Sequence, residues 1–231
     1  MKYSEAGFRA IYKHMCLFPM CSAVKKALKF FPGAEKANCA LVYGYIDCEA
    51  GMTLEVLAAG CKDEHGSVFF DGNDTIKSMI RIGAVQDEPF EVIDDSALQA
   101  RYAKKIAILD HYAAPDDVEK TRGITILDSC RDSGCIDDIL VYLTKTGLQP
   151  EGVWVRLSGM GNSCVVGGGR FKEPHHIYGL KGKLLNEPYQ DFGYHVGNEI
   201  CVLAFTTEDK KAICHSDEKL IKELSLLFKD I

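Results

Sequence analysis

Residues 177–206 read IYGLKGKLLNEPYQDFGYHVGNEICVLAFT, and this stretch decides the fold class. It predicts two strands, 177–185 and 199–206, on either side of a polar loop that also carries aromatic residues. Pro188 lies just after the first strand, where a residue without an N–H ends ladder pairing. Asn186 precedes it and is expected to hydrogen-bond within its own turn.

Further strands are expected on both sides of this stretch. The run 153–157 (VWVRL) precedes it and the run 211–214 follows it. Strands in series with few helices between them indicate a mainly antiparallel sheet or a small barrel-like domain with flanking helices, and therefore an α+β class. A final helix is expected from Ser216 or Asp217 to Phe228, with its apolar residues at helical spacing.

Two elements are expected ahead of these strands. Residues 124–128 (ITILD) predict a short strand. Asp132 or Ser133 is a suitable N-cap for a helix that would end at Gly147. Its apolar residues fit helical spacing: Ile136, Ile139, Leu140 and Leu143.

The first half mixes helices and strands. The expected elements are a helix at 23–31, strands at 40–46, 53–57 and 67–70, and a longer helix at 96–112. Ser96 and Gln99 have the spacing of a capping box at the start of the longer helix. The polar stretch 114–123 is the best candidate boundary. We therefore predict two domains, a mixed α+β domain of unknown role over 1–118 and a strand-rich α+β domain over 119–231.

Composition and charge exclude several classes of protein. The 231 residues are 47% hydrophobic and 26% charged, as is usual in globular proteins. No apolar run reaches the ~18 residues of a membrane span, and the first residues lack the cleavage site of a signal peptide. The net charge of −6 is spread over both halves without a large basic face. We therefore predict a cytoplasmic protein that binds neither nucleic acid nor membrane.

The ten cysteines are scattered and form no CxxC motif. In a cytoplasmic chain most are expected to be reduced and buried, which suits Cys39, Cys61 and Cys201 among their apolar neighbours. The cysteine spacings do not match those of zinc sites, so neither a metal nor a cofactor is predicted. The weaker alternative is a metal-binding enzyme with ligands drawn from this set: His175 or His176, His195, and Cys214 or His215.

The run 164–170, CVVGGGR, has the cysteine-to-arginine spacing of a phosphate-binding thiolate loop. In such a loop Cys164 would attack phosphorus, while backbone amides and the forked guanidinium of Arg170 would hold the phosphate oxygens. Both residues, with Gly167 and Gly169, match the CxxGxGR core of the protein tyrosine phosphatases.

Several neighbours of this run differ from that phosphatase pattern. Ser163 stands where the family has His, and Phe171 stands where it has Ser or Thr. The loop must also lead into a helix whose N-terminus lowers the thiol pKa, but Pro174 and Gly179 disfavour a helix there. A long glycine-rich hairpin loop is therefore preferred, with positive φ angles supplied by its glycines: Gly159, Gly161 and 167–169.

A second candidate anion site is the run 128–134, DSCRDSG, between the expected strand and helix. Amides at a helix start could bind an anion there with help from Arg131. The carboxylates in and after this run oppose that role, and helix capping explains them.

Three motifs in the second half carry a family resemblance: EGVWV at 151–155, YGLKGKLLNEP at 178–188 and GYHVGNEI at 193–200. They resemble the YegJ-like bacterial family of unknown function, whose pattern is a strand with mWV, a strand with G.l.N.P and then GD.v. Asn198 stands where that family has Asp. The resemblance covers about residues 150–202 and implies a small strand-rich domain, with relatives among proteins described as immunity proteins against bacterial toxins. It implies no reaction.

The loop after the first quoted strand is the candidate binding surface. Tyr189, Asp191, Tyr194 and His195 crowd it, and an aromatic loop on a rigid sheet is suited to binding a partner. A packed turn that covers a barrel end is an equal alternative, because Tyr and Phe satisfy both roles.

These observations predict a non-enzymatic bacterial protein that binds a protein partner, with an immunity-type role as the concrete form. The alternative is a thiol-dependent phosphatase that uses Cys164 and Arg170. The two differ in whether residues 171–178 are helical.

Overall fold

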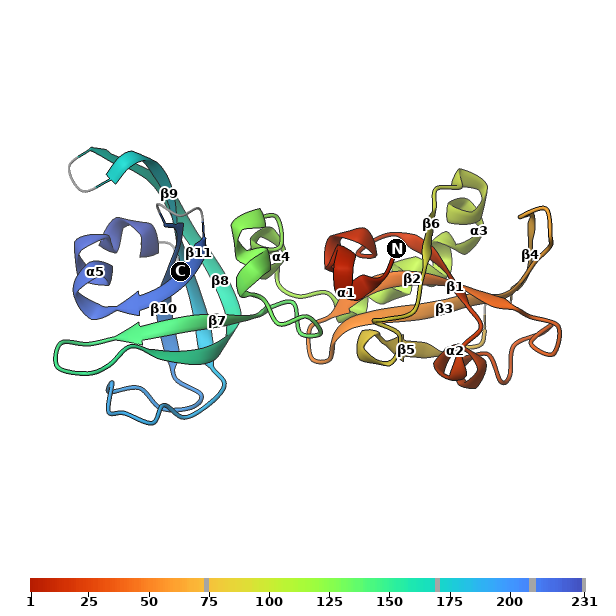
Figure 1. Ribbon diagram of the computed structural model, residues 1–231, viewed down its shortest axis with the longest axis horizontal. Helices are drawn as coiled ribbons and strands as arrows, with labels where there is room; N and C mark the ends of the chain where they lie inside the picture. Colours follow the sequence, from red (N-terminus) through yellow and green to blue (C-terminus); the bar gives the residue numbers. More distant parts are fainter. Residues whose placement is uncertain (73–74, 169–170, 208–210, 230–231) are drawn as a thin grey trace. The chain divides into compact units, whose positions relative to one another are not determined.

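The computed structural model describes residues 1–72, 75–168, 171–207 and 211–229. The fold is α+β, as predicted (Figure 1). The chain divides into two compact units, Met1–Ala113 and Ala114–Ile231. The division falls at the start of the polar stretch 114–123, so the short helix α4 (Asp116–Thr121) belongs to the second unit.

The first unit is built on an antiparallel sheet with the strand order β4-β3-β2-β1-β6, and β5 also pairs with β3. Its strands are β1 (Met15–Pro19), β2 (Cys39–Asp47), β3 (Gly51–Lys62), β4 (Val68–Gly72), β5 (Met79–Arg81) and β6 (Glu91–Ile93). Its helices are α1 (Tyr3–Ala6), η1 (Phe8–Ala10), α2 (Ser22–Ala27), η2 (Ile82–Ala84), α3 (Ser96–Ala107) and η3 (Ile108–Tyr112).

The centre of this sheet, β2 and β3, is buried along almost its whole length. A strand that is covered on both faces lacks the alternation of apolar and polar residues. The expected strand over 53–57 was therefore too short, since β3 continues through Ala58, Ala59 and Gly60 to Lys62. On one face Tyr102 of α3 packs against residues of three strands: Met15, Leu41, Leu57 and Ala58.

The start of α3 differs from the prediction by one residue. Asp95 is the N-cap, and its carboxylate accepts hydrogen bonds from the N–H groups of Ala97 and Leu98 at 2.8 and 3.1 Å. The predicted capping box of Ser96 and Gln99 is therefore wrong, because an aspartate one position earlier takes that role.

Lys105 of α3 is buried against β3. Its Nζ donates to the carbonyl oxygens of Val56 at 2.6 Å and Ile76 at 2.9 Å, and lies 3.5 Å from the Glu55 carboxylate. Burial raises the pKa of Glu55, although the nearby ammonium of Lys105 opposes that shift. The lysine thus fixes the helix to the sheet through backbone carbonyls, a contact that the apolar stripe of the helix does not reveal.

The second unit contains a closed barrel with the strand order β10-β11-β7-β8-β9. All the pairs are antiparallel except β11 with β7. Its strands are β7 (Asp138–Thr144), β8 (Glu151–Gly168), β9 (Phe171–Leu184), β10 (Glu199–Thr206) and β11 (Ala212–Asp217), and its helices after α4 are η4 (Thr125–Cys130), α5 (Glu218–Glu223) and η5 (Ser225–Phe228).

Two predictions at the start of this unit are wrong. Residues 124–128, expected as a strand, lie mostly in the 3₁₀ helix η4, which closes part of the barrel core through Leu127. The expected helix after Asp132 is instead β7. Its residues Ile139, Val141 and Leu143 are fully buried while Tyr142 is exposed, which is the period of two that defines a half-buried strand. Helical spacing and strand alternation overlap in this short run, and barrel pairing decides between them.

The C-terminal helices cover the outside of the barrel over β9 and β10. Leu227 of η5 is buried with Ile177 and Leu203, whose side chains point outward from the barrel. Gly179 makes this close approach possible, because a Cβ there would lie 2.6 Å from the carbonyl oxygen of Leu227. Asp217 caps α5 by accepting from the N–H of Leu220. Within the described residues, no helix is long and apolar enough to cross a membrane.

Candidate functional site

The candidate binding loop, residues 185–198, connects β9 to β10 and lies at the lower left in Figure 1. Glu151 of β8 holds its backbone: one carboxylate oxygen accepts from the N–H of Tyr189 at 2.7 Å and the other from the N–H of Gln190 at 3.2 Å. The Gln190 side chain exchanges two hydrogen bonds with the backbone of Gln149. The loop is therefore fixed to the turn before β8.

Side chains within the loop fix its remaining backbone. Asn186 accepts a hydrogen bond from the N–H of Trp154 at 2.7 Å. It therefore binds the neighbouring strand, whereas the sequence predicts a hydrogen bond within its own turn. Asn198 accepts from the N–H of His195, and Asp191 accepts from the N–H of Gly193. Gly193 has φ of 84°, a conformation that favours glycine.

The four predicted binding residues take different positions in this loop. Tyr189 is 99% exposed. Asp191 is also exposed, but it serves the turn at Gly193, and Tyr194 is half-buried against the barrel core. The neighbouring Phe192 is buried in that core. Phe192 and Tyr194 therefore pack against the barrel core, as a covering turn would, whereas Tyr189 faces solvent.

His195 is exposed and pairs with Glu187. Its Nδ1 lies 2.6 Å from one carboxylate oxygen, and the other oxygen accepts from the N–H of Val196. The hydrogen bond with Glu187 raises the pKa of His195, and the same contact lowers the pKa of Glu187. The side chains of His195 and Glu187 are 74% and 52% exposed, so solvent screens their interaction and the pair contributes little to stability.

An aromatic strip on the outside of the barrel adjoins the start of the loop. Leu185, the first residue of the loop, donates its N–H to the carbonyl oxygen of Trp154, and Trp154 pairs with Leu140 across β7 and β8. Leu140 and Tyr142 both lie over Gly152, the position in β8 that has no side chain. Trp154, Tyr142 and Leu185 are 38%, 42% and 38% exposed.

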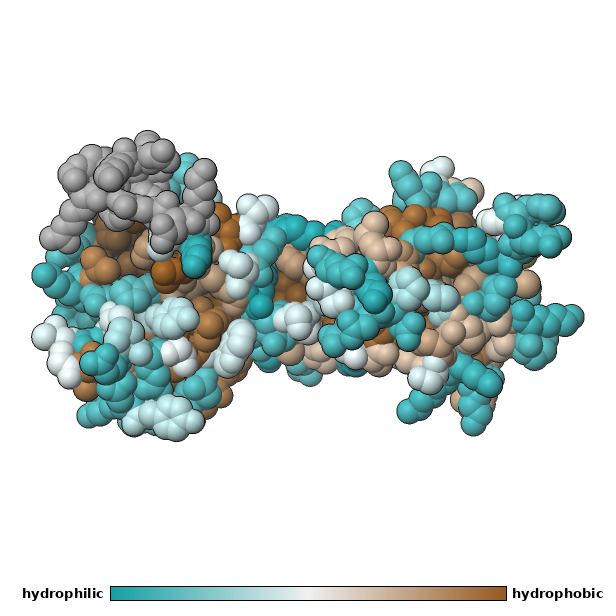
Figure 2. Space-filling view, in the orientation of Figure 1, coloured by the Kyte–Doolittle hydropathy of each residue, from teal (hydrophilic) through white to brown (hydrophobic). Residues whose placement is uncertain are grey.

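This strip is not apparent from the sequence. Trp154 belongs to the expected strand 153–157, and Tyr142 falls where the sequence predicts a helix. The alternation of residues 138–144 was the available signal. Figure 2 shows hydrophobic and hydrophilic side chains interspersed on the face in view, and the region of the loop is mainly hydrophilic.

Residues 164–168 of the CVVGGGR run form the end of β8, which pairs with β9 (Figure 1). Cys164 pairs with Ile177, and its side chain packs against the apolar cluster under α5 and η5. The chain continues as strand β9 from Phe171, so the helix that a phosphatase loop requires does not follow. Arg170 and Gly169 lie outside the described residues.

The glycines of this hairpin serve a different purpose from the predicted one. Gly159 and Gly161 belong to β8 and do not have positive φ. The register with β9 shifts between Leu157 and Gly159 and again between Met160 and Ser163. Gly159 and Gly161 therefore lie at or beside these irregularities, because glycine tolerates the local distortion of a bulge.

Arg131 has a structural role instead of the considered anion-binding one. It is buried and donates to the carbonyl oxygens of Ile136 at 2.6 Å and Thr121 at 2.7 Å. Arg122, the C-cap residue of α4, is also buried and donates to both carboxylate oxygens of Asp137. These arginines fix α4 to the segment before β7.

Among the described side chains, the histidines of the possible metal site do not form a cluster, and the side chain of His175 lies outside the described part. His215 is half-buried in β11, with Nε2 2.8 Å from Oγ1 of Thr144, whose hydroxyl donates to Asp217 at 2.8 Å. Asp217 is ionised, since its hydrogen bonds outweigh burial and lower its pKa. The hydroxyl therefore donates to the carboxylate, and His215 Nε2–H donates to the hydroxyl. Over the four described ranges, no three His, Cys, Asp or Glu side chains gather as a metal site.

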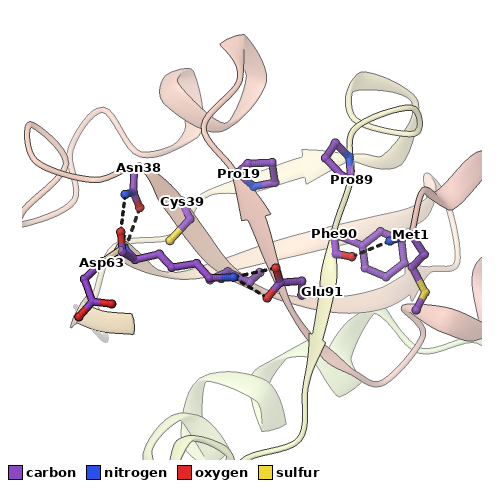
Figure 3. Close-up of a pocket in the computed structure, with 10 residues that line it drawn as sticks. Met1, Pro19, Asn38, Cys39, Asp63, Pro89, Phe90 and Glu91 are labelled. Atoms are coloured by element: carbon purple, nitrogen blue, oxygen red, sulfur yellow. Dashed lines mark hydrogen bonds and ion pairs between the residues drawn. The ribbon is translucent and has the colours of Figure 1, made fainter. Parts of the chain in front are cut away.

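A pocket of about 490 Å³ lies in the first unit (Figure 3). Its apolar wall includes Leu17, Pro19 and Phe90. Its polar groups already bind each other: Lys62 Nζ donates to both carboxylate oxygens of Glu91, and Asn38 exchanges two hydrogen bonds with the Lys62 backbone. The pocket could hold a small apolar group, but its polar groups are not arranged to select a ligand.

The cysteines are less buried than predicted. Cys39 is buried as expected, but Cys201 is only half-buried and Cys61 is exposed at the end of β3. Burial raises the pKa of Cys16 to about 12, so this thiol is unreactive.

Comparison with protein-family models, with curated proteins and with solved structures gives no match to this chain. The resemblance of residues 150–202 to the YegJ-like family therefore stays a prediction.

Proposed function

We propose that the protein acts by binding another protein through its second unit. The contact surface would consist of the 185–198 loop and the strip of Tyr142, Trp154 and Leu185. The observation that carries this proposal is Tyr189, which is 99% exposed on a loop whose backbone is fixed at both ends. Exposed Tyr and Trp side chains are the residues most enriched among binding hot spots.

The fixed backbone of the loop supports this role. Ordering a mobile loop on binding reduces affinity, and a loop that is already held by Glu151, Asn186 and Asn198 avoids much of that loss. The exposed Glu187–His195 pair beside it can supply a polar rim around an aromatic centre.

The resemblance gives the proposal its concrete form. A YegJ-like protein with an immunity-type role would bind a bacterial toxin, and its activity would be the formation of that complex. The phosphatase alternative gains no support, because β9 occupies the place of the required helix.

Photocrosslinking tests the proposal in two steps. A photoreactive phenylalanine analogue replaces Tyr189 in the full chain, and in a control chain it replaces Phe69, an exposed aromatic residue of the first unit. We expect one discrete protein adduct at position 189 and none of the same mass at position 69. The adduct is then identified by mass spectrometry.

Direct binding to the purified partner is the second step. We expect Tyr189→Ala and Trp154→Ala each to weaken binding by roughly tenfold or more, as hot-spot truncations do. Phe69→Ala should leave the affinity unchanged. The proposal fails if position 189 gives no adduct, if both positions capture the same proteins, or if the adduct joins two copies of this chain.

A further inference from the structure

Two cysteines from distant parts of the chain meet at the edge of the barrel core. Cys130 is the last residue of η4, and Cys214 lies in β11. The Cys130 thiol donates to the carbonyl oxygen of Ala212 at 3.7 Å, two residues before Cys214 on the same strand. The side chain of Cys214 lies within hydrogen-bonding reach of the Cys130 sulfur. Both belong to the same apolar cluster, and both are free thiols.

The surroundings favour negative charge on one of these sulfurs. Ionised Cys130 would accept from the Cys214 thiol first, and also from the Ser129 hydroxyl and the N–H of Cys214. The positive charge of Arg131 acts in the same direction. These contacts lower the pKa of Cys130, whereas the contact with Cys130 and burial raise the pKa of Cys214.

Access is also unequal. Cys130 keeps 9% of its surface exposed, while Cys214 keeps 1%. A small oxidant would therefore meet Cys130 first, and Cys214 is in position to react second.

We propose that Cys130 and Cys214 form a dithiol modification site, which a hydroperoxide oxidises to an intramolecular disulfide. The Cys130 thiolate attacks one oxygen of hydrogen peroxide, which breaks the O–O bond, gives a sulfenic acid and releases hydroxide. The sulfur of Cys214 then attacks the Cys130 sulfur, and the S–O bond breaks. The two thiol protons combine with the two hydroxyl groups of the peroxide and leave as two molecules of water, so the thiols are oxidised and the peroxide is reduced.

The disulfide would join η4 to β11 at a place where the two elements already pack. Because Ala212 and Cys214 are held in the barrel ladder by β10, the bond would restrain the end of η4 against a fixed strand. This inference is independent of the proposed partner binding, since neither cysteine belongs to the 185–198 loop.

The test uses the full chain and hydrogen peroxide. After exposure at neutral pH, the free thiols are alkylated under denaturing conditions and the peptides are mapped by mass spectrometry without reduction. We expect a peptide pair joined through Cys130 and Cys214, with alkylation of both cysteines reduced together by roughly tenfold, because the disulfide consumes both thiols. Cys16, a buried thiol without a partner thiol in contact, is the internal control and should be alkylated as in the untreated protein.

Variants separate the two chemical steps. In Cys214→Ser, the sulfenic acid on Cys130 should persist and be trapped by dimedone. In Cys130→Ser, Cys214 should stay reduced. The proposal is overturned if wild-type Cys130 and Cys214 are fully alkylated under conditions that oxidise the exposed Cys48 or Cys61. It is also overturned if Cys130 is found joined to another cysteine.

Discussion

Cys164 illustrates how one residue can fit a catalytic pattern and still have a packing role. Its sulfur lies among apolar side chains from β9, β10 and η5: Ile177, Leu203 and Leu227. Its neighbour in the ladder, Ile177, is buried by the same helices. A side chain in this position contributes by contact area and not by nucleophilicity.

Replacing Cys164 tests that assignment. We expect Cys164→Ser to lower the free energy of unfolding by about 1 kcal/mol, as for other conservative changes at half-buried positions. Hydrolysis of p-nitrophenyl phosphate should stay at the uncatalysed rate in both proteins. Turnover in the wild type that disappears in the variant would restore the phosphatase interpretation.

His215 is the second residue whose environment has a measurable consequence. Burial lowers its pKa from 6.5, although the charge of Asp217 opposes that shift. Its Nδ1 is buried without a hydrogen-bond partner among the described residues. Protonation would place a donor and a positive charge there, so the folded state favours the neutral ring.

This arrangement predicts a pH dependence of stability. A base whose folded pKa lies below its unfolded value binds more protons when unfolded. His215 therefore contributes fully above pH 6.5, and stability is lost as the pH falls below it, by at most about 1.4 kcal/mol per pH unit for one proton. Urea unfolding at pH 7.5 and pH 5.5 should show a smaller loss for His215→Gln than for wild type. An equal loss of unfolding free energy in wild type and His215→Gln would contradict this prediction.

At the scale of elements, α3 is fixed to its sheet by a single buried charge as well as by its apolar face. The helix places Lys105 over the middle of β3, where its ammonium donates to the carbonyl oxygens of Val56 and Ile76 and faces Glu55. Removal of one partner of a buried pair leaves the other charge without compensation.

We therefore expect Lys105→Ala to lower the free energy of unfolding by about 3–5 kcal/mol. Lys104→Ala, an exposed lysine on the same helix, should change it by less than about 0.5 kcal/mol. Chemical denaturation followed by circular dichroism measures both. Adding Glu55→Gln to Lys105→Ala should recover part of the loss, and no recovery would show that the carboxylate is not the source of the cost.

At the scale of the whole molecule, the two units have separate cores. The barrel core is formed by residues between Ile124 and Cys214, and the cluster outside it by residues between Cys164 and Phe228. The first unit is completed by contacts within Met1–Ala113. Each unit thus contains the apolar contacts that a domain needs.

This separation makes the second unit testable as a fragment. Residues 114–231 should fold alone, with a cooperative thermal transition and a dispersed NMR spectrum, because every described member of the barrel core cluster belongs to this range. A fragment ending at Thr206 is the matched control and should not fold, since it lacks β11 and the barrel cannot close. A disordered 114–231 fragment would show that its stability depends on the first unit.

The sequence by itself determined the α+β class and the two strands within residues 177–206, because these residues combine strand-forming runs with a proline just after the first run. It also indicated that the loop between the two strands would carry aromatic residues. It could not assign residues 136–143, since a short apolar run fits both helix and strand until β8 and β11 pair with it. The same limit hid the outer strip, as Tyr142 and Trp154 become neighbours of the loop only after β7, β8 and β9 are in register.

Only the tertiary structure decided what the chemically suggestive residues do. Sequence spacing misleads in two ways. It can suggest a reactive site that the fold does not form, as from Cys164 onward, and it can miss residues that folding brings together, as with Cys130 and Cys214. Local spacing suggested a reactive loop where the chain forms a hairpin, and it gave no sign of a thiol pair whose members are far apart in sequence. The physical reason is that the pKa and the accessibility of a thiol depend on groups brought to it by folding.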